Sequence, residues 1–231
     1  MQKLLTIENI RADIIKAHEK EGARLQSWEY CYAFFRNYKD YREDKEWLDK
    51  AALHLGFFLA SWGMLRGSTF LLQLNYTYYK HVIEVLLDQK YDALWDIRWN
   101  IDAPEKHIDL LFELVKHLTQ IMEEKSGFEN RKPTDTLITK IIMATMGCVP
   151  AYDTYFTSGL KIFLEKRGGK LSNSFTKASF AELLSLSRTD AELCKIYDVS
   201  IPTVIPGVNY TPMKLLDAYF WQVYDDLNPS K

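Results

Sequence analysis

Apolar residues recur along most of the chain at the three- and four-residue spacing of helices that bury one face. In residues 102–125 this spacing follows Asp102 as a candidate N-cap and Pro104 in the first turn. Thr211 followed by Pro212 marks the start of a C-terminal helix, which we expect to pack on the body of the protein. No run of alternating apolar and polar residues indicates a strand. The pattern predicts an all-α, multi-helical globular protein.

The most apolar window, residues 51–74, is long enough to cross a bilayer. It contains His54, Arg66 and several glycines near its middle, however, and such residues are costly inside a membrane. We therefore expect a buried helix pair, bent near residues 63–67, and no membrane association.

Gly, Pro, Asn and Ser cluster at residues 127–133, 166–174 and 199–209, which predicts loops between the helices. None of these stretches is of low complexity, as a long linker would be. We treat residues 1–231 as a single helical domain. The pattern leaves open two helical lobes with a boundary near residue 127.

The charge balance and the cysteine and histidine content limit the classes of function that this sequence allows. The 29 Lys and Arg residues nearly balance the 31 Asp and Glu residues, so binding to nucleic acid would need a local basic patch. Cys31, Cys148 and Cys194 are far apart and form no CxxC motif, which argues against disulfides and a zinc–thiolate site. Without an export signal, this predicts a cytoplasmic protein. The five histidines form no HExxH motif, and we expect neither a metal nor a cofactor.

The stretch MGCVPAYDTYF joins two predicted helices. The first starts at Thr134 or Asp135 and ends at Gly147, where a left-handed residue fits. Pro150 blocks immediate continuation, so Asp153 falls at or just inside the first turn of the next helix. Such a carboxylate either caps the helix or stabilises positive charge on a substrate.

The segment ITKIIMATMGCVPAYDTYF resembles the helix-hairpin-helix DNA glycosylase superfamily. In that family a helix, a turn with Gly and Pro, and an Ala-hydrophobic-Asp-Thr-aromatic stretch place the catalytic Asp at a helix N-terminus. The resemblance implies that Asp153 supports the departure of a damaged base from its sugar. This chain lacks the family's Gly-hydrophobic-Gly hairpin and carries Thr136 where bifunctional members have a lysine nucleophile. We therefore do not expect a lyase or, without a cysteine cluster, an iron–sulfur centre.

Two hypotheses of function follow, and the sequence leaves open whether the protein is an enzyme. The first is a glycosylase-like protein that binds duplex DNA through a local basic patch. This hypothesis assigns Asp153 as the catalytic residue, Tyr152, Tyr155 and Arg66 as substrate contacts, and Arg131, Lys132 and Lys140 as nucleic-acid contacts.

The second is a non-catalytic helical module that binds a partner chain or forms a homo-oligomer, with Asp153 as a cap.

Overall fold

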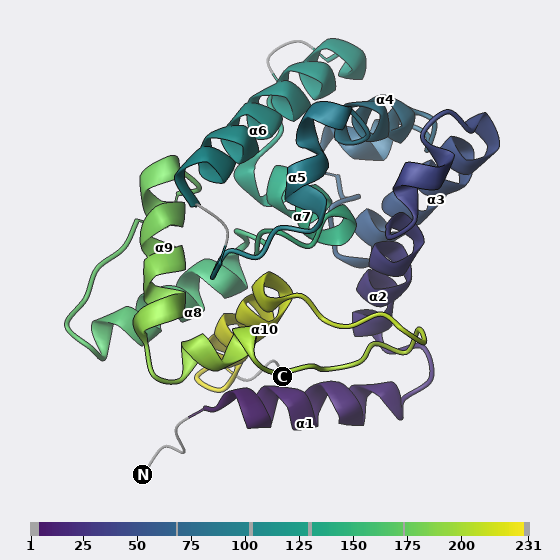
Figure 1. Ribbon diagram of the computed structural model, residues 1–231. Coiled ribbons are helices and arrows are strands. Elements are labelled where there is room, and N and C mark those ends of the chain that lie inside the picture. The colour runs from purple at the N-terminus through teal and green to yellow at the C-terminus, as the bar shows by residue number, and fades with distance from the viewer. Residues whose placement is uncertain (1–4, 68, 102–103, 129–130, 173, 229–231) are drawn as a thin grey trace.

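The computed structural model describes residues 5–67, 69–101, 104–128, 131–172 and 174–228 (Figure 1). It is 65% helical, and in the described ranges the only β-type pairing is an isolated bridge between Pro202 and Asn209. The predicted all-α class is therefore confirmed.

Ten α-helices are present among the described residues. The α-helices are α1 (Ile7–His18), α2 (Arg24–Phe35), α3 (Lys45–Ser61), α4 (Tyr78–Leu86), α5 (Asp92–Trp95), α6 (Pro104–Ser126), α7 (Asp135–Thr145), α8 (Thr154–Glu165), α9 (Lys177–Thr189) and α10 (Pro212–Asp225). Four 3-10 helices join them: η1 (Tyr38–Tyr41), η2 (Phe70–Gln73), η3 (Gln89–Tyr91) and η4 (Leu193–Tyr197).

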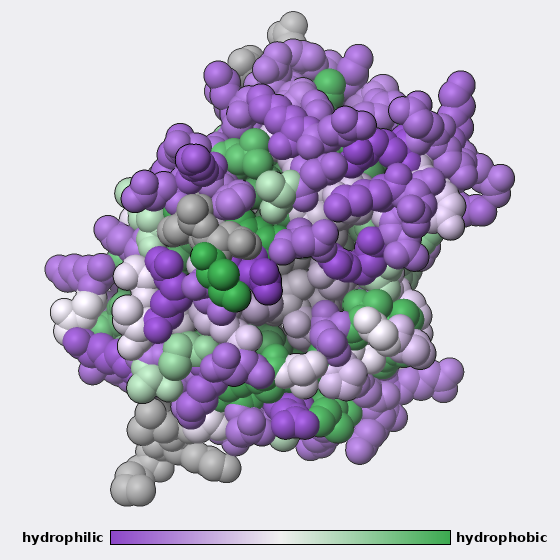
Figure 2. All heavy atoms as spheres, in the orientation of Figure 1, coloured by the Kyte–Doolittle hydropathy of each residue, from purple (hydrophilic) through white to green (hydrophobic). Residues whose placement is uncertain are grey.

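Helix α7 forms the centre of the molecule. All its residues from Leu137 to Thr145 are buried, and it contacts α2, α3 and α6 (Figure 1). The most extensive helix contact is between α8 and α10, and α1 packs against α10 from the outside. Helices from both sides of residue 127 thus pack together, while the division into one domain or two lobes stays a prediction. The face drawn in Figure 2 is mainly hydrophilic, with scattered small apolar patches.

The predicted helix boundaries around the central turn are confirmed. Thr134 caps α7 by accepting a hydrogen bond from the backbone N–H of Leu137, and Thr211 caps α10. Gly147 has a φ of 67°, as the end of α7 requires. A Cβ at Gly147 would lie 2.8 Å from the Tyr32 ring and 2.7 Å from the Thr211 methyl, so the turn also needs glycine for close packing.

The predicted helix pair over residues 51–74 is wrong. The segment forms the end of α3, a turn, and the 3-10 helix η2, because Gly63 adopts a φ of 73° and ends α3. Among the described residues, no helix combines the length and apolar character needed to cross a bilayer. The cytoplasmic location stays a prediction, and Asp102, the candidate cap of α6, lies outside the described residues.

Candidate functional site

The turn before α8 is held by hydrogen bonds from two other helices. Thr136 Oγ1 donates to the carbonyl of Tyr152 at 2.8 Å, and the N–H of Tyr152 donates to Thr139 Oγ1 at 2.9 Å. The N–H of Ala151 donates to Asp217 Oδ1 at 3.0 Å. Because the buried backbone groups are satisfied by side chains of α7 and α10, the turn is fixed relative to both helices.

Asp153 is the N-cap of α8. Its Oδ1 accepts the backbone N–H groups of Tyr155 and Phe156, each at 3.1 Å, and its Oδ2 lies 3.2 Å from Lys140 Nζ. The Lys140 ammonium also donates to the carbonyl of Trp62, at the end of α3, at 3.1 Å. The carboxylate is therefore both a cap and one member of an ion pair, whose side chains are 18% and 8% exposed.

A second ion pair lies in the interior nearby. Lys214 Nζ contacts Asp217 Oδ2 at 2.5 Å, and the two residues are 2% and 4% exposed. Burial raises the pKa of Asp217, Lys214 opposes that rise, and the charge of Asp153 adds to it. The Lys214 ammonium lies 4.7 Å from the ring centroid of Trp62 and 5.7 Å from that of Trp28. Two lysine–aspartate pairs thus flank the turn that leads into α8.

A cleft with a volume of about 430 Å³ opens beside Asp153, and we call it the Asp153 cleft. It lies between the starts of α7, α8 and α2 and the turn after α3. Its charged lining residues are Asp153, Lys140, Arg66 and Arg24, and its aromatic ones are Trp62, Tyr155 and Trp221. Tyr155 stacks on Trp221, with ring centroids 5.5 Å apart and planes 13° apart. The cleft combines a carboxylate, cations and flat aromatic surfaces.

The structure brings four of the predicted site residues to this cleft: Asp153, Tyr155, Arg66 and Lys140. Arg66 is exposed, and the cation that pairs with Asp153 is Lys140. Lys140 is buried, so it cannot serve as the surface phosphate contact that the sequence suggested. The reason is that its partners, Asp153 and the Trp62 carbonyl, are both held inside the fold.

Tyr152 does not line the cleft, contrary to the expectation that it shapes a substrate pocket. It is 4% exposed, and its ring contacts Phe156 and Phe175 at centroid distances of 5.1 and 4.6 Å. Its hydroxyl is buried without a hydrogen-bond partner, and burial raises its pKa. It is a core residue.

Arg131 and Lys132 are exposed and lie outside the cleft lining. They directly precede Pro133 and Thr134, and Thr134 does line the cleft. The Arg131 guanidinium lies 5.9 Å from the Phe128 ring centroid. Both cations therefore stand near one end of the cleft, as accessible groups.

Sequence reasoning missed three residues of the cleft lining, Arg24, Trp62 and Trp221, and the buried pair Lys214 and Asp217, which lies outside that lining. Lys214 and Asp217 stand three positions apart on α10, next to its apolar stripe, and two opposite charges beside a buried stripe were the available signal. Trp62 precedes the glycine that ends α3, and Arg24 and Trp221 carry no local signal of a site. Only the tertiary fold brings together Arg24 of α2, Trp62 of the turn after α3 and Trp221 of α10.

No model of a known protein family, no curated protein and no solved structure matches this chain. In the part of the chain that the structure describes, no group of three or more His, Cys, Asp or Glu side chains is arranged to hold a metal ion.

Proposed function

We propose that the Asp153 cleft binds a nucleotide unit of nucleic acid, and that the protein is a DNA glycosylase-like, base-excising protein with Asp153 as its catalytic carboxylate. The observation that carries the proposal is the meeting in one cleft of a helix-capping carboxylate, stacked aromatic rings and two guanidinium groups that make no ion pair with any described residue. The local resemblance of the segment around Asp153 to glycosylases supports the same activity.

The size and the walls of the cleft suit a planar ligand. About 430 Å³ falls within the range of roughly 300 to 1,000 Å³ that is typical of small-molecule sites. Trp62, Tyr155 and Trp221 offer ring faces, and stacking of a base on an aromatic side chain contributes about 1 to 3 kcal/mol. A base turned out of its strand would find stacking partners here.

Arg24 and Arg66 are the groups best placed to meet phosphates. Both are exposed at the cleft, and neither makes an ion pair within the described part of the chain. A guanidinium matches the geometry of phosphate oxygens through paired N–H donors. Lys140, by contrast, is neutralised by Asp153. The cleft therefore carries excess positive charge at its rim and a compensated pair inside.

Asp153 is held in a fixed orientation at the cleft, and for it to stabilise a cationic sugar the substrate has to displace Lys140 from its Oδ2. Its Oδ1 is occupied by two backbone N–H groups, which fix the side chain, while Oδ2 faces Lys140 in the cleft lining. A fixed carboxylate in a partly water-excluded site stabilises positive charge as it develops on a substrate. Because the fold already fixes the carboxylate, no further free energy is spent on orienting it when a substrate binds.

The test compares the parent with Asp153→Asn on duplexes that contain alkylated or oxidised bases. We expect base release from at least one lesion by the parent and none by the variant. A melt of both proteins is the control, because Asn also caps helices but leaves Lys140 without its counter-charge. If the parent releases no base from any duplex, the catalytic part of the proposal is wrong.

Binding is tested separately through its salt dependence. Each lost phosphate contact should lower the slope of log affinity against log salt by about 0.9 on duplex DNA. We expect Arg24→Ala with Arg66→Ala to lower the slope, and Arg131→Ala with Lys132→Ala to do so if those side chains extend the path. Lys161→Ala is the matched control, because this exposed lysine of α8 lies outside the cleft and pairs with Glu165. Equal slopes for all variants would exclude the cleft as the binding surface.

One observation favours the non-catalytic alternative. On the outer face of α3, Leu53 and Phe57 are 48% and 70% exposed, one helical turn apart. An exposed apolar pair of this kind is a candidate contact for another helical chain. If the protein is a homo-oligomer through this face, Phe57→Ser should shift its sedimentation to a smaller species, whereas the nucleic-acid proposal expects no change.

A further inference from the structure

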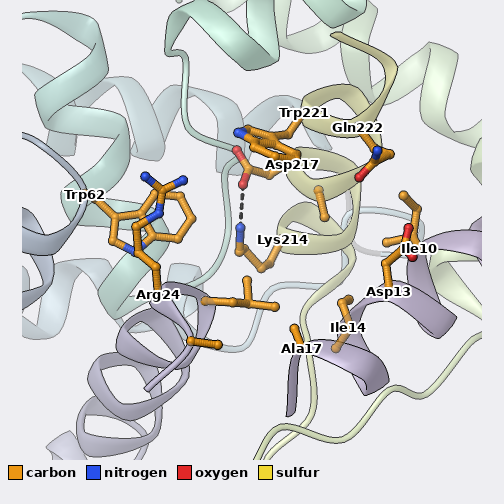
Figure 3. Close-up of a pocket in the computed structure, with 13 residues that line it drawn as sticks. Ile10, Asp13, Ile14, Ala17, Arg24, Trp62, Lys214, Asp217, Trp221 and Gln222 are labelled. Carbon is orange, nitrogen blue, oxygen red and sulfur yellow. Dashed lines mark hydrogen bonds and ion pairs between the residues drawn. The ribbon is translucent and has the colours of Figure 1, made fainter. Parts of the chain in front are cut away.

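A second cavity shares Trp62 and Trp221 with the Asp153 cleft, and we call it the α1 chamber. Its volume is about 320 Å³, and it lies between α1, the start of α2 and α10 (Figure 3). Ile10, Ile14 and Ala17 of α1 form one wall, and most of the exposed lining is apolar. A cavity of this size and composition suits the apolar body of a small molecule.

The inner end of the chamber carries a buried cation with spare hydrogen-bonding capacity. Lys214 is 2% exposed and lines the chamber, and an ammonium group has three N–H donors. Among the hydrogen bonds of the described residues, Nζ donates one, to Asp217. Nζ also lies near two indole rings, that of Trp62 in the chamber lining and that of Trp28 behind it. A ring face is a weaker partner than an oxygen acceptor, so the chamber lacks an acceptor at Lys214.

Asp217 does not supply the missing acceptor for Lys214, and it does not favour a cationic ligand. Its Oδ2 accepts from Lys214, and its Oδ1 accepts from the backbone N–H of Ala151. Both oxygens are thus already partnered, whereas the lysine is not fully so. The asymmetry favours a ligand that brings an acceptor or a negative charge.

The charges at the mouth limit how negative the ligand is. Figure 3 shows Arg24 beside Trp62 on one side of the chamber and Asp13 of α1 on the other. Arg24 and Lys214 together balance Asp13 and Asp217, so the lining has no net charge. One added negative charge can be held by the two cations, while two would meet repulsion from both carboxylates.

The aromatic residues favour a flat body. Trp62 and Trp221 line the chamber as well as the Asp153 cleft, and the Arg24 guanidinium lies 5.7 Å from the Trp62 ring centroid. Offset stacking on an indole adds to the apolar contacts that the isoleucines of α1 provide. An aliphatic chain would gain only the apolar contacts.

We propose that the α1 chamber is a binding site for a small aromatic monocarboxylate, with the ring between the tryptophans and α1 and the carboxylate hydrogen-bonded to Lys214. Nothing in this site depends on nucleic-acid binding, and no residue other than Arg24, Trp62 and Trp221 is common to both cavities.

Isothermal titration with 2-naphthoate tests the proposal on the full chain, with 2-naphthalenemethanol, 2-naphthylmethylamine and octanoate as probes of charge and shape. We expect saturable binding of 2-naphthoate, at least tenfold weaker binding of the alcohol and of octanoate, and none of the amine. Tighter binding of the amine would overturn the assignment of charge. Octanoate binding as well as naphthoate would overturn the aromatic class.

Variants locate the site. Ala17→Phe places a ring in the chamber and should abolish binding, whereas Ala12→Phe on the exposed face of α1 is the matched control and should not. Lys214→Met combined with Asp217→Leu removes both buried charges together and should weaken naphthoate binding at least tenfold. Arg66→Ala, which changes only the Asp153 cleft, should leave it unchanged. Absence of saturable binding by the folded parent, or full binding by Ala17→Phe, refutes the proposal whatever the outcome with DNA.

Discussion

At Gly159 the backbone of α8 leaves no room for a Cβ against the backbone of α10, and replacement of this glycine by alanine tests the packing of these two helices. A Cβ at Gly159 would lie 1.8 Å from the carbonyl oxygen of Phe220 and 2.7 Å from its carbonyl carbon. Ordinary contact starts at 3.4 Å, so the two backbones would have to separate by about 1.6 Å. No side-chain rotation relieves the clash, because the atoms that it meets belong to the backbone of α10.

The cost can be worked out from the contacts that such a movement loosens. The rings of Phe156 and Phe163 contact the ring of Phe220 at centroid distances of 5.5 and 5.4 Å. Each such pair contributes about 0.5 to 1.5 kcal/mol, and overpacking strain adds about 1 to 3 kcal/mol. Replacing a helical glycine by alanine returns about 1 kcal/mol through helix propensity. We expect Gly159→Ala to lower the free energy of unfolding by about 1 to 5 kcal/mol, and Tm by roughly 2 to 20 °C.

Urea unfolding followed by far-ultraviolet circular dichroism measures this loss. Gly67→Ala is the control, because a Cβ there meets no atom within 4 Å and its φ is not left-handed. Ser158→Ala tests the adjacent position of α8. If Gly159→Ala is as stable as the parent, α8 and α10 do not approach as described, and the geometry that relates Asp153 to Asp217 would be wrong as well.

Two further predictions follow from the burial of titratable groups. His54 stacks on Phe34, with ring centroids 4.1 Å apart, and its burial lowers its pKa from the ordinary 6.5. The stability that neutral His54 contributes is therefore present above pH 6.5 and is lost as the pH falls through the lowered pKa. The difference in urea unfolding free energy between the parent and His54→Gln should therefore change between pH 7.5 and 5, and a constant difference would contradict this. Burial also raises the pKa of Cys31 and of Cys148, so at pH 8 a thiol reagent should label only Cys194 in the native protein and all three thiols in denaturant. Rapid labelling of all three in the native state would contradict the described core.

The sequence was sufficient where the physical cause is local. The cap at Thr134, the left-handed Gly147 and the cap at Asp153 each involve only a few neighbouring residues, and all three are confirmed. Such signals depend on backbone hydrogen bonds within one turn, which a short motif specifies. The prediction of a bent helix pair was wrong because a glycine can either bend a helix or end it, and Gly63 ends α3.

The orientation of individual side chains could not be predicted, because it depends on distant partners. Tyr152 and Tyr155 flank the same aspartate, yet Tyr152 meets Phe175 in the core and Tyr155 meets Trp221 at the cleft. Lys140 likewise follows an apolar helical pattern, and only the fold shows that its amine is paired with Asp153. The periodicity of a helix gives its buried face but not which residue of another helix covers it.

The two lysine–aspartate pairs are difficult to explain by stability alone. Burial of an ion pair costs several kcal/mol per ion, and apolar residues of similar volume often stabilise as well or better. Such residues abound around them: Phe156 and Phe220 already join α8 to α10. Yet Lys140 and Asp153 line one cavity, and Lys214 and Asp217 line the other. Glu29 is also fully buried, pairs with His18 and lines neither cavity, so a buried charge does not by itself mark a ligand site. The two lysine–aspartate pairs differ from it because each lines a cavity, and there the charges are available to the ligands that we propose.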